Sequence, residues 1–369
     1  MPTLLQYLLA IGTFQGVLLS ALLLFTRHIN YASRVLGVWC GFLATGLLIQ
    51  LFQQEGDIQT YGILLAVTGF MPASFGALLY LYCRHSVLDD SFKARDLLHF
   101  IPFVSCYVLN IDLLLDPDRV VQTFLLGTQA PSVRYLLSEI IMFGQAYIYM
   151  VYTAVFIYQY QQRAQNNYAG FNPDTFYWLW IVQGFNLIIW SIKTTATVQG
   201  DGTFLSVAGD ILIVFLIYGI GLAQWRNPQL FKVAIPLSSA PASKTQEAKT
   251  AGALEADTRV AIMHTINQYM QSQQAFLDSE LSLRRLSDAV DISTHHLSEA
   301  LNQEEGQNFY NYVNRFRIEY VCQQLAQDQE LKLLDIGLQA GFSSKSTFNA
   351  VFKKHTGQTP TQYRANRLR

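Results

Sequence analysis

Charged residues are scarce in this chain. Asp, Glu, Lys and Arg make up 14% of its 369 residues, whereas about a quarter is usual in soluble domains. Hydrophobic residues make up 51%. So little charge excludes a protein whose whole surface is hydrated, and the composition indicates that a large part of the chain lies in a membrane.

Cysteine is also rare, and its spacing excludes two kinds of site. The four cysteines, Cys40, Cys83, Cys106 and Cys322, form no C-x-x-C pair, and the first three lie in apolar runs. We interpret them as reduced filler residues rather than disulfide or zinc positions. The sequence also lacks a supported nucleophile and a cluster of His, Asp or Glu at ligand spacing. We therefore expect no enzyme activity, no metal and no cofactor.

Acidic residues are missing from the C-terminal end. Between positions 336 and 369 there is no Asp or Glu, but there are basic residues at Lys345, Lys353, Lys354, Arg364, Arg367 and Arg369. The net charge of -1 for the whole chain hides this asymmetry. A local excess of positive charge suggests a polyanionic partner, and a solvated surface is the alternative.

Apolar runs dominate the sequence before residue 226. Seven of them approach the roughly 20 residues that cross a bilayer, at 5–26, 34–53, 60–83, 98–115, 134–160, 177–198 and 204–224. The first has no basic residue before it and no small-residue cleavage site, so we expect it to remain in the mature protein. The last contains no lysine, which excludes a retinal protein, since such proteins need a lysine within the last span.

Lysine and arginine fall mainly on one side of the seven predicted spans. If the N-terminus is outside, the outer side holds Arg119, Arg134 and Lys193, and the inner side holds Arg27, Arg34, Arg84, Lys93, Arg95, Arg163, Arg226 and Lys232. Because short cytoplasmic loops accumulate basic residues, we expect a multi-pass protein of the bacterial inner membrane with a cytoplasmic C-terminus. The assignment depends on the fourth run, since without it the C-terminus would change sides.

Several polar residues fall inside the last three predicted spans, where they are costly and suggest function. We expect them to form a ligand pocket that opens outward and includes Glu139, Gln183, Asn186, Trp190, Lys193 and Asp210. A structural ion-pair cluster, or a lysine that reaches the outer surface, is the alternative. Two G-x-x-x-G patterns suit close helix packing or a homodimer, Gly12 with Gly16 and Gly37 with Gly41.

The composition changes after residue 226. Within 227–257 the chain is rich in Ala, Ser, Thr and Pro and has no periodic apolar stripe, which predicts a flexible linker. Residues 258–369 return to an ordinary soluble composition with amphipathic helical patterns, over the length of one small domain. We therefore expect an all-α protein with a seven-helix transmembrane domain over 1–226, the linker, and a soluble domain over 258–369.

A short pattern occurs twice in the soluble part. LSDAVDIS at 286–293 aligns with IGLQAGFS at 336–343, and a helix-like stretch follows each copy. Each copy has a small residue where two helices cross, a turn residue that tolerates positive φ, and a serine that can cap the next helix. These pairs are Ser287 and Gly337, Asp291 and Gly341, and Ser293 and Ser343. The repeat predicts two helix-turn-helix units.

These residues resemble the DNA-binding domain of the AraC/XylS family of bacterial transcription regulators. The likeness is close in NFYNYVNRFRI, RFRIEYVCQQLA and LLDIGLQAGFSSKSTFNAVFKKHTGQTPTQYR. The family pattern recurs here at Gly341, Phe342, Ser343, Phe348, Phe352, Lys353, Gly357, Pro360, Tyr363 and Arg364. Gly337 departs from it, since the family commonly has Ala there. The resemblance implies two helix-turn-helix subdomains joined by a long helix at about 308–326. The whole chain resembles, more loosely, a membrane-anchored branch of this family.

A recognition helix presents the exposed residues of its first turns to base edges. In the two units these are Thr294, His295, His296, Glu299, Ser344, Lys345, Ser346 and Asn349. Nearby basic residues suit phosphates, namely Arg317, Lys353, Lys354 and Arg364. The alternatives are mere exposure for His295 and His296, a solvated helix position for Glu299, and a brace of the linking helix for Arg317.

We therefore expect a membrane-embedded, sequence-specific DNA-binding transcription regulator that responds to a signal sensed by its spans. The expected partners are double-stranded DNA, the lipid bilayer and an unknown small-molecule or membrane signal. The sequence leaves open whether the chain forms a homodimer. The alternative is a membrane transporter or receptor whose C-terminal helical domain binds proteins.

Overall fold

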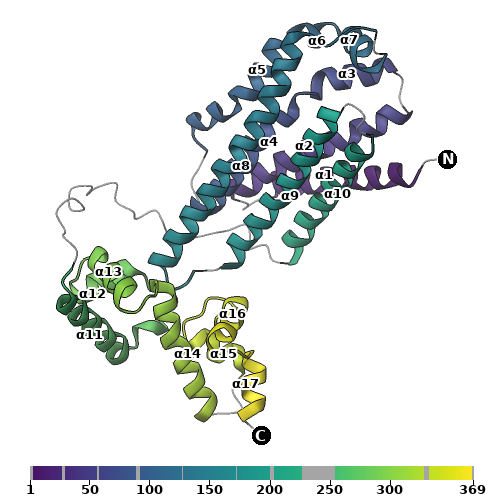
Figure 1. Cartoon of the computed structure of the whole chain (residues 1–369). Coiled ribbons are helices and arrows are strands. Elements are labelled where there is room, and N and C mark those ends of the chain that lie inside the picture. The colour runs from purple at the N-terminus through teal and green to yellow at the C-terminus, as the bar shows by residue number, and fades with distance from the viewer. Residues whose placement is uncertain are drawn as a thin grey trace. The chain divides into compact units, whose positions relative to one another are not determined.

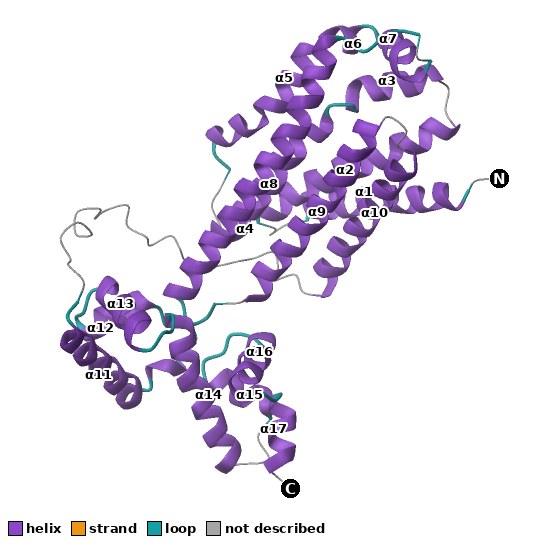
Figure 2. Ribbon diagram, in the orientation of Figure 1, coloured by secondary structure: helices purple, strands orange, loops and turns teal. Residues whose placement is uncertain are grey.

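The computed structural model describes residues 3–26, 30–55, 58–88, 92–126, 128–171, 173–199, 203–226, 254–327 and 332–367. Over these ranges the regular elements are all helices, joined by the loops that Figure 2 shows. The one extended pairing recorded within them is an isolated antiparallel bridge between Tyr168 and Ser282. The expected all-α fold class is confirmed.

The chain divides into two compact units, which we describe separately. The first contains Met1–Ile157 and Tyr177–Pro236, and the second contains Tyr158–Phe176 and Leu237–Arg369. The second unit thus includes a segment that the sequence assigns to the transmembrane part. Most of the predicted linker, 227–253, lies outside the described residues.

The first unit is built from helices that follow one another along the chain (Figure 1). They are α1 (Leu4–Phe25), α2 (Tyr31–Glu55), α3 (Ile58–Thr68), η1 (Met71–Ser74), α4 (Phe75–Leu88), η2 (Ala94–Phe100), α5 (Ile101–Leu109), α6 (Ile111–Leu115), α7 (Pro117–Val120), η3 (Val121–Leu125), α8 (Val133–Asn167), α9 (Pro173–Gln199) and α10 (Thr203–Arg226). From Tyr158 onward, α8 belongs to the second unit.

Five helical stretches of the described chain, not seven, are long and apolar enough to cross a membrane. They are Leu4–Phe25, Tyr31–Phe52, Thr60–Leu88, Val133–Asn167 and Phe204–Ala223. The predicted fourth span is divided among η2, α5 and α6, because the backbone leaves helical geometry at Asn110. The predicted sixth span is a continuous helix within α9, but Gln183, Asn186 and Lys193 lower its hydropathy.

The glycine patterns of α1 and α2 serve packing inside this unit. A Cβ atom on Gly12 would lie 2.6 Å from a side chain of α10, and one on Gly16 would lie 2.8 Å from Ala44 of α2. On α2, Gly37 and Gly41 approach α1 equally closely, at 2.9 Å. The close approach of helices within one chain therefore accounts for both patterns without a homodimer.

The second unit contains α11 (Ala256–Gln273), η6 (Ala275–Leu277), α12 (Leu283–Val290), α13 (Thr294–Glu304), α14 (Phe309–Gln327), α15 (Leu333–Gln339), α16 (Lys345–Thr356) and α17 (Pro360–Arg367). The linking helix α14 matches the predicted range closely. A core of apolar side chains from α11 to α14 includes Ile266, Leu286, Leu297 and Val313, all fully buried. Beyond α14, buried aromatic rings of the turn and of α16 hold α15 and α16 together.

Candidate nucleic-acid interface

The first helix-turn-helix unit consists of α12 and α13. α12 ends at Asp291, whose φ of 54° lies in the left-handed region. Within the turn, Ser287 Oγ donates to the carbonyl oxygen of Ile292 at 2.6 Å. Ser293 then caps α13, because its Oγ accepts from the backbone N–H of His296 at 3.2 Å. Turn and cap lie where the sequence predicts them.

The second helix-turn-helix unit consists of α15 and α16, and its turn, at 340–344, is two residues longer than the turn at 291–293. Gly341 has a φ of 90°, and a Cβ atom on Gly337 would lie 2.8 Å from the ring of Phe348, so the predicted turn and close crossing are confirmed. The predicted cap is wrong by one position. Ser344, not Ser343, has extended geometry and accepts a backbone N–H bond in the first turn of α16.

α13 and α16 each bury one apolar face, so the polar residues of their first turns lie on the opposite, outer face. Leu297 and Leu301 of α13, and Phe348 and Phe352 of α16, are at most 1% exposed. Among the candidate DNA-contacting residues, the exposed ones are Thr294, His295, Lys345, Ser346, Lys353 and Lys354. The half-buried ones are His296, Glu299, Ser344, Asn349 and Arg364. This is the arrangement that a helix needs in order to read a major groove.

Two of these side chains already have partners within the unit. Glu299 Oε1 accepts from the backbone N–H of Leu254 at 2.9 Å, and its side chain is 12% exposed. Lys354 Nζ donates to Asn311 Oδ1 of α14 at 3.1 Å. Lys353 is therefore better placed than Lys354 to bind a phosphate, and Glu299 is better suited to a structural role than to a base contact.

Arg317 does not face solvent, which contradicts its assignment to a DNA phosphate. The residue is 1% exposed, and its guanidinium donates to the carbonyl oxygens of Phe276 at 2.8 Å, Ala169 at 3.0 Å and Asp278 at 2.8 Å. It also lies over the ring of Phe342, 5.6 Å from the centroid. Burial lowers the pKa of Arg317 to about 10, which leaves it charged at neutral pH. The bracing role is the one that the structure supports.

A turn from the middle of the chain also packs into this unit, and no pattern in the sequence signals it. We call residues 168–171 the docking turn. The backbone N–H of Ala169 donates to the carbonyl oxygen of Leu281 at 3.0 Å, and Ala169 is 1% exposed within the core of α11 to α14. Phe171 meets Tyr310 edge to face with 5.3 Å between ring centroids. Most of these contacts are made by the main chain, so neither the hydrophobic periodicity nor the residue types of the sequence predict them.

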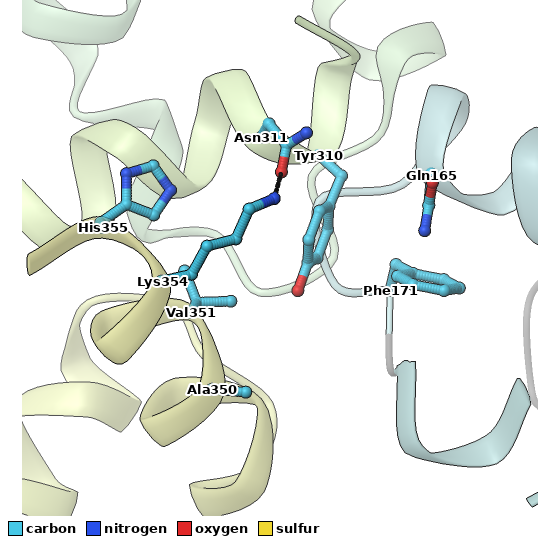
Figure 3. Close-up of a pocket in the computed structure, with 8 residues that line it drawn as sticks. All are labelled: Gln165, Phe171, Tyr310, Asn311, Ala350, Val351, Lys354 and His355. Carbon is cyan, nitrogen blue, oxygen red and sulfur yellow. Dashed lines mark hydrogen bonds between the residues drawn. The ribbon is translucent and has the colours of Figure 1, made fainter. Parts of the chain in front are cut away.

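A cavity of about 220 Å³ lies beside the docking turn (Figure 3). It is lined by Gln165, Phe171, Tyr310, Asn311, Ala350, Val351, Lys354 and His355. Burial lowers the pKa of His355, and the nearby charges of Lys354 and Arg315 lower it further. The end of α8, α14 and α16 thus meet around one small space.

In the first compact unit, which contains α9 and α10, the structure pairs two of the residues expected to line a ligand pocket. Lys193 Nζ lies 2.6 Å from Asp210 Oδ1 and 3.1 Å from the carbonyl oxygen of Ser206. Glu139 lies on α8, one helical turn after Tyr135. This geometry favours the ion-pair alternative for the lysine and aspartate, and the outward pocket stays a prediction.

The other expected pocket residues are buried between helices. Gln183 Nε2 donates to the carbonyl oxygen of Met150 at 2.9 Å, which ties α9 to α8. Trp190 packs edge to face on Phe143, with 5.7 Å between ring centroids. Asn186 is 4% exposed. These contacts hold α8 and α9 together, whatever else the residues do.

A buried polar cluster lies near α4. The count of lysines and arginines in the predicted loops does not reveal it. Arg84 Nη1 lies 2.6 Å from Asp96 Oδ1, and both residues are buried. Nearby, His99 Nδ1 lies 2.8 Å from the hydroxyl of Tyr149 on α8. In sequence terms, the signal was a basic residue at the end of an apolar run and an acidic residue twelve positions later. Such a pair looks like ordinary loop charge until the fold brings it inside.

Part of the C-terminal unit is similar to known proteins. Residues 286–366 match a family described as a helix-turn-helix domain. An uncharacterized HTH-type transcriptional regulator of Staphylococcus aureus (strain COL) is 38% identical over 102 residues, which are 28% of this chain and 14% of that protein. The probable transcription factor PqrA of Proteus vulgaris is 36% identical over 74 residues, 20% of this chain and 60% of that protein.

Among solved structures, a protein of unknown function from Listeria innocua is 31% identical and covers 28% of this chain and 95% of its own, with a TM-score of 0.26. The chain spans 14% of the length of the staphylococcal relatives. The staphylococcal relative is named as a transcriptional regulator and the Proteus relative as a probable transcription factor. Residues 286–366 of this chain therefore carry a helix-turn-helix domain.

Proposed function

We propose that this chain is a membrane-embedded transcription regulator that binds double-stranded DNA in a sequence-specific way and responds to a signal that reaches its transmembrane helices. One observation carries the proposal. Two helix-turn-helix units share the helix α14, and the second helix of each unit presents an exposed polar first turn.

The exposed residues fall into two groups, those suited to base edges and those suited to phosphates. Lys345 at the start of α16 suits the paired acceptors of guanine in the major groove, and Ser346 and Thr294 suit either a base or a phosphate. Lys353, two turns further on, suits the backbone. If the two recognition helices enter successive major-groove faces, about 34 Å apart, a single domain reads one long asymmetric site.

The apolar helices support a membrane location, and the docking turn constrains the topology. Because this turn packs against the C-terminal unit, both lie on one side of any membrane. The chain between them contains α9 and α10, so either both helices cross or neither does. Since α10 is apolar enough to cross, α9 crosses as well, with Lys193 neutralised by Asp210.

The shared side is the cytoplasm, where DNA is found and where basic loop residues accumulate. Arg163, near the end of α8, lies on that side under this topology. The N-terminus is outside if the segment 98–115 crosses the membrane despite its break at Asn110.

The test uses the full chain in lipid nanodiscs. Chromatin captured with the tagged protein should yield discrete promoter fragments. For such a fragment, the logarithm of the binding constant should fall linearly as the logarithm of the salt concentration rises. Lys345→Ala should reduce discrimination between this fragment and random duplex, by about 1–3 kcal/mol, while Lys353→Ala should weaken both by a similar factor. No retention of any promoter duplex at low salt by folded protein would refute the function.

A further inference from the structure

The docking turn joins the two parts of the chain at a second place besides the linker. α8 contains 35 residues, about 52 Å at 1.5 Å per residue, whereas the apolar interior of a bilayer is about 30 Å thick. The end of α8 therefore extends beyond the membrane and passes directly into the docking turn. After the turn, the chain returns through α9. A predicted flexible linker transmits geometry poorly, but a continuous helix does not bend freely.

The docking turn reaches the junction of the two helix-turn-helix units. The carbonyl oxygen of Ala169 accepts from Arg317 Nη1 at 3.0 Å. The same guanidinium bonds to Phe276 and Asp278, which precede α12, and lies over Phe342 in the turn before α16. One buried cation thus contacts the docking turn, the segment just before the first helix-turn-helix unit, and the turn of the second helix-turn-helix unit.

Removal of the docking turn would leave a buried donor of Arg317 without its acceptor. Unpaired buried donors are costly, so the guanidinium would move or admit water. Either change loosens the contacts that Arg317 makes with the segment before α12 and with the turn before α16. The docking turn also fills part of the core, since Ala169 packs among residues of α11 to α14.

We propose that the docking turn, residues 168–171, is the element that couples the transmembrane helices to DNA binding. When docked, it holds the two recognition helices in the spacing that a long DNA site requires. A signal that shifts α8 against α9 withdraws it and lowers affinity for that site. This inference rests on the proposed function, and it names how that function is regulated.

Gly170 gives a precise way to release the docking turn. A Cβ atom there would lie 2.6 Å from the carbonyl oxygen of Ser279, so Gly170→Val cannot keep the docked geometry without a shift of backbone. Gly184 in α9 has open space around it, and Gly184→Ala is the matched control. Phe171→Ala, which removes the contact with Tyr310 without a clash, is a second releasing variant.

Two measurements on the full chain in nanodiscs test the proposal. Hydrogen exchange should show protection at Ala169 in the wild type and in Gly184→Ala, and loss of it in Gly170→Val and Phe171→Ala, with the core of α11 to α13 still protected. Affinity for a promoter fragment captured by the wild type should then fall about fivefold or more in the releasing variants, the size of a typical coupling between sites.

Each outcome decides the question. Fast exchange at Ala169 in the folded wild type would overturn the docking itself. Unchanged or tighter DNA binding after release would overturn the coupling. If the wild type retains no duplex at all, the proposed function fails and the coupling fails with it, while the exchange data still show whether the docking turn is bound.

Discussion

At the scale of single residues, Arg317 shows how a position that resembles a DNA contact can serve the interior. A guanidinium offers donors in a planar fork, and here three carbonyl oxygens accept from it within one buried space. A lysine in the same place has one ammonium group and cannot reach all three acceptors. The geometry therefore depends on arginine, although both residue types are basic.

We expect Arg317→Lys to lower the free energy of unfolding of the C-terminal unit by about 3 kcal/mol, since buried charged groups would lose partners. Arg315→Lys is the control, because Arg315 forms a half-exposed pair with Glu305 and its replacement should cost about 0.5–1 kcal/mol. Denaturant titration followed by hydrogen exchange of the full chain measures both. Equal losses in the two variants would contradict the bracing role.

His355 predicts how the C-terminal unit responds to pH. Its pKa is lowered in the folded state by burial and by Lys354 and Arg315, from an ordinary value of 6.5. The unfolded state therefore binds a proton first, so stability should fall as the pH drops below about 6.5 and level off beneath the folded pKa. In His355→Gln this part of the pH dependence should disappear. Thermal unfolding between about pH 5 and pH 8 measures it, and an unchanged slope would contradict the prediction.

At the scale of elements, the two helix-turn-helix units show how far a repeat predicts geometry. The turn residues Asp291 and Gly341 both have positive φ as expected, because few residue types accept that region and the choice leaves a mark in the sequence. The cap of α16 moved by one position, because Ser343 and Ser344 are adjacent and either can cap. Local chemistry fixed the presence of the cap but not its register.

A comparison of Gly341 with Gly357 distinguishes the cost of backbone strain from the cost of a steric clash. Both have positive φ, at 90° and 75°, but a Cβ atom on Gly341 would lie 2.7 Å from the carbonyl oxygen of Phe276, whereas Gly357 has open space. We expect Gly357→Ala to cost about 1–2 kcal/mol and Gly341→Ala about 3 kcal/mol or more. Denaturant titration of the full chain gives both values. Equal costs would mean that the turn relaxes away from Phe276.

At the scale of the whole molecule, composition predicted the division into an apolar part and a soluble part, but not how they are joined. Hydropathy marks five long apolar helices, and it leaves two of the predicted spans without support, the segment broken at Asn110 and the more polar helix α9. The docking turn left no mark, because Ala169 bonds to Arg317 across 148 positions through its main chain. Contacts of this kind depend on the fold and not on residue type.

The pair of Lys193 and Asp210 tests whether the polar residues of α9 and α10 hold the fold or sense a signal. Their atoms lie 2.6 Å apart, and in an apolar surrounding a lone charge is costly, so Asp210→Asn should destabilise the first unit by about 3–5 kcal/mol. The double variant Lys193→Met with Asp210→Leu removes both charges and should restore most of that loss. Thermal unfolding of the full chain in nanodiscs compares the three proteins.

The double variant also separates stability from response. If the pair serves the fold alone, the restored protein should bind promoter DNA and lose that binding on a signal as the wild type does. If it is part of a ligand pocket, the restored protein should fold and bind DNA but no longer respond, because the ligand would lose its charged partners. Failure of the double variant to recover stability would show that neither residue can be replaced by an apolar one, which contradicts a simple ion pair.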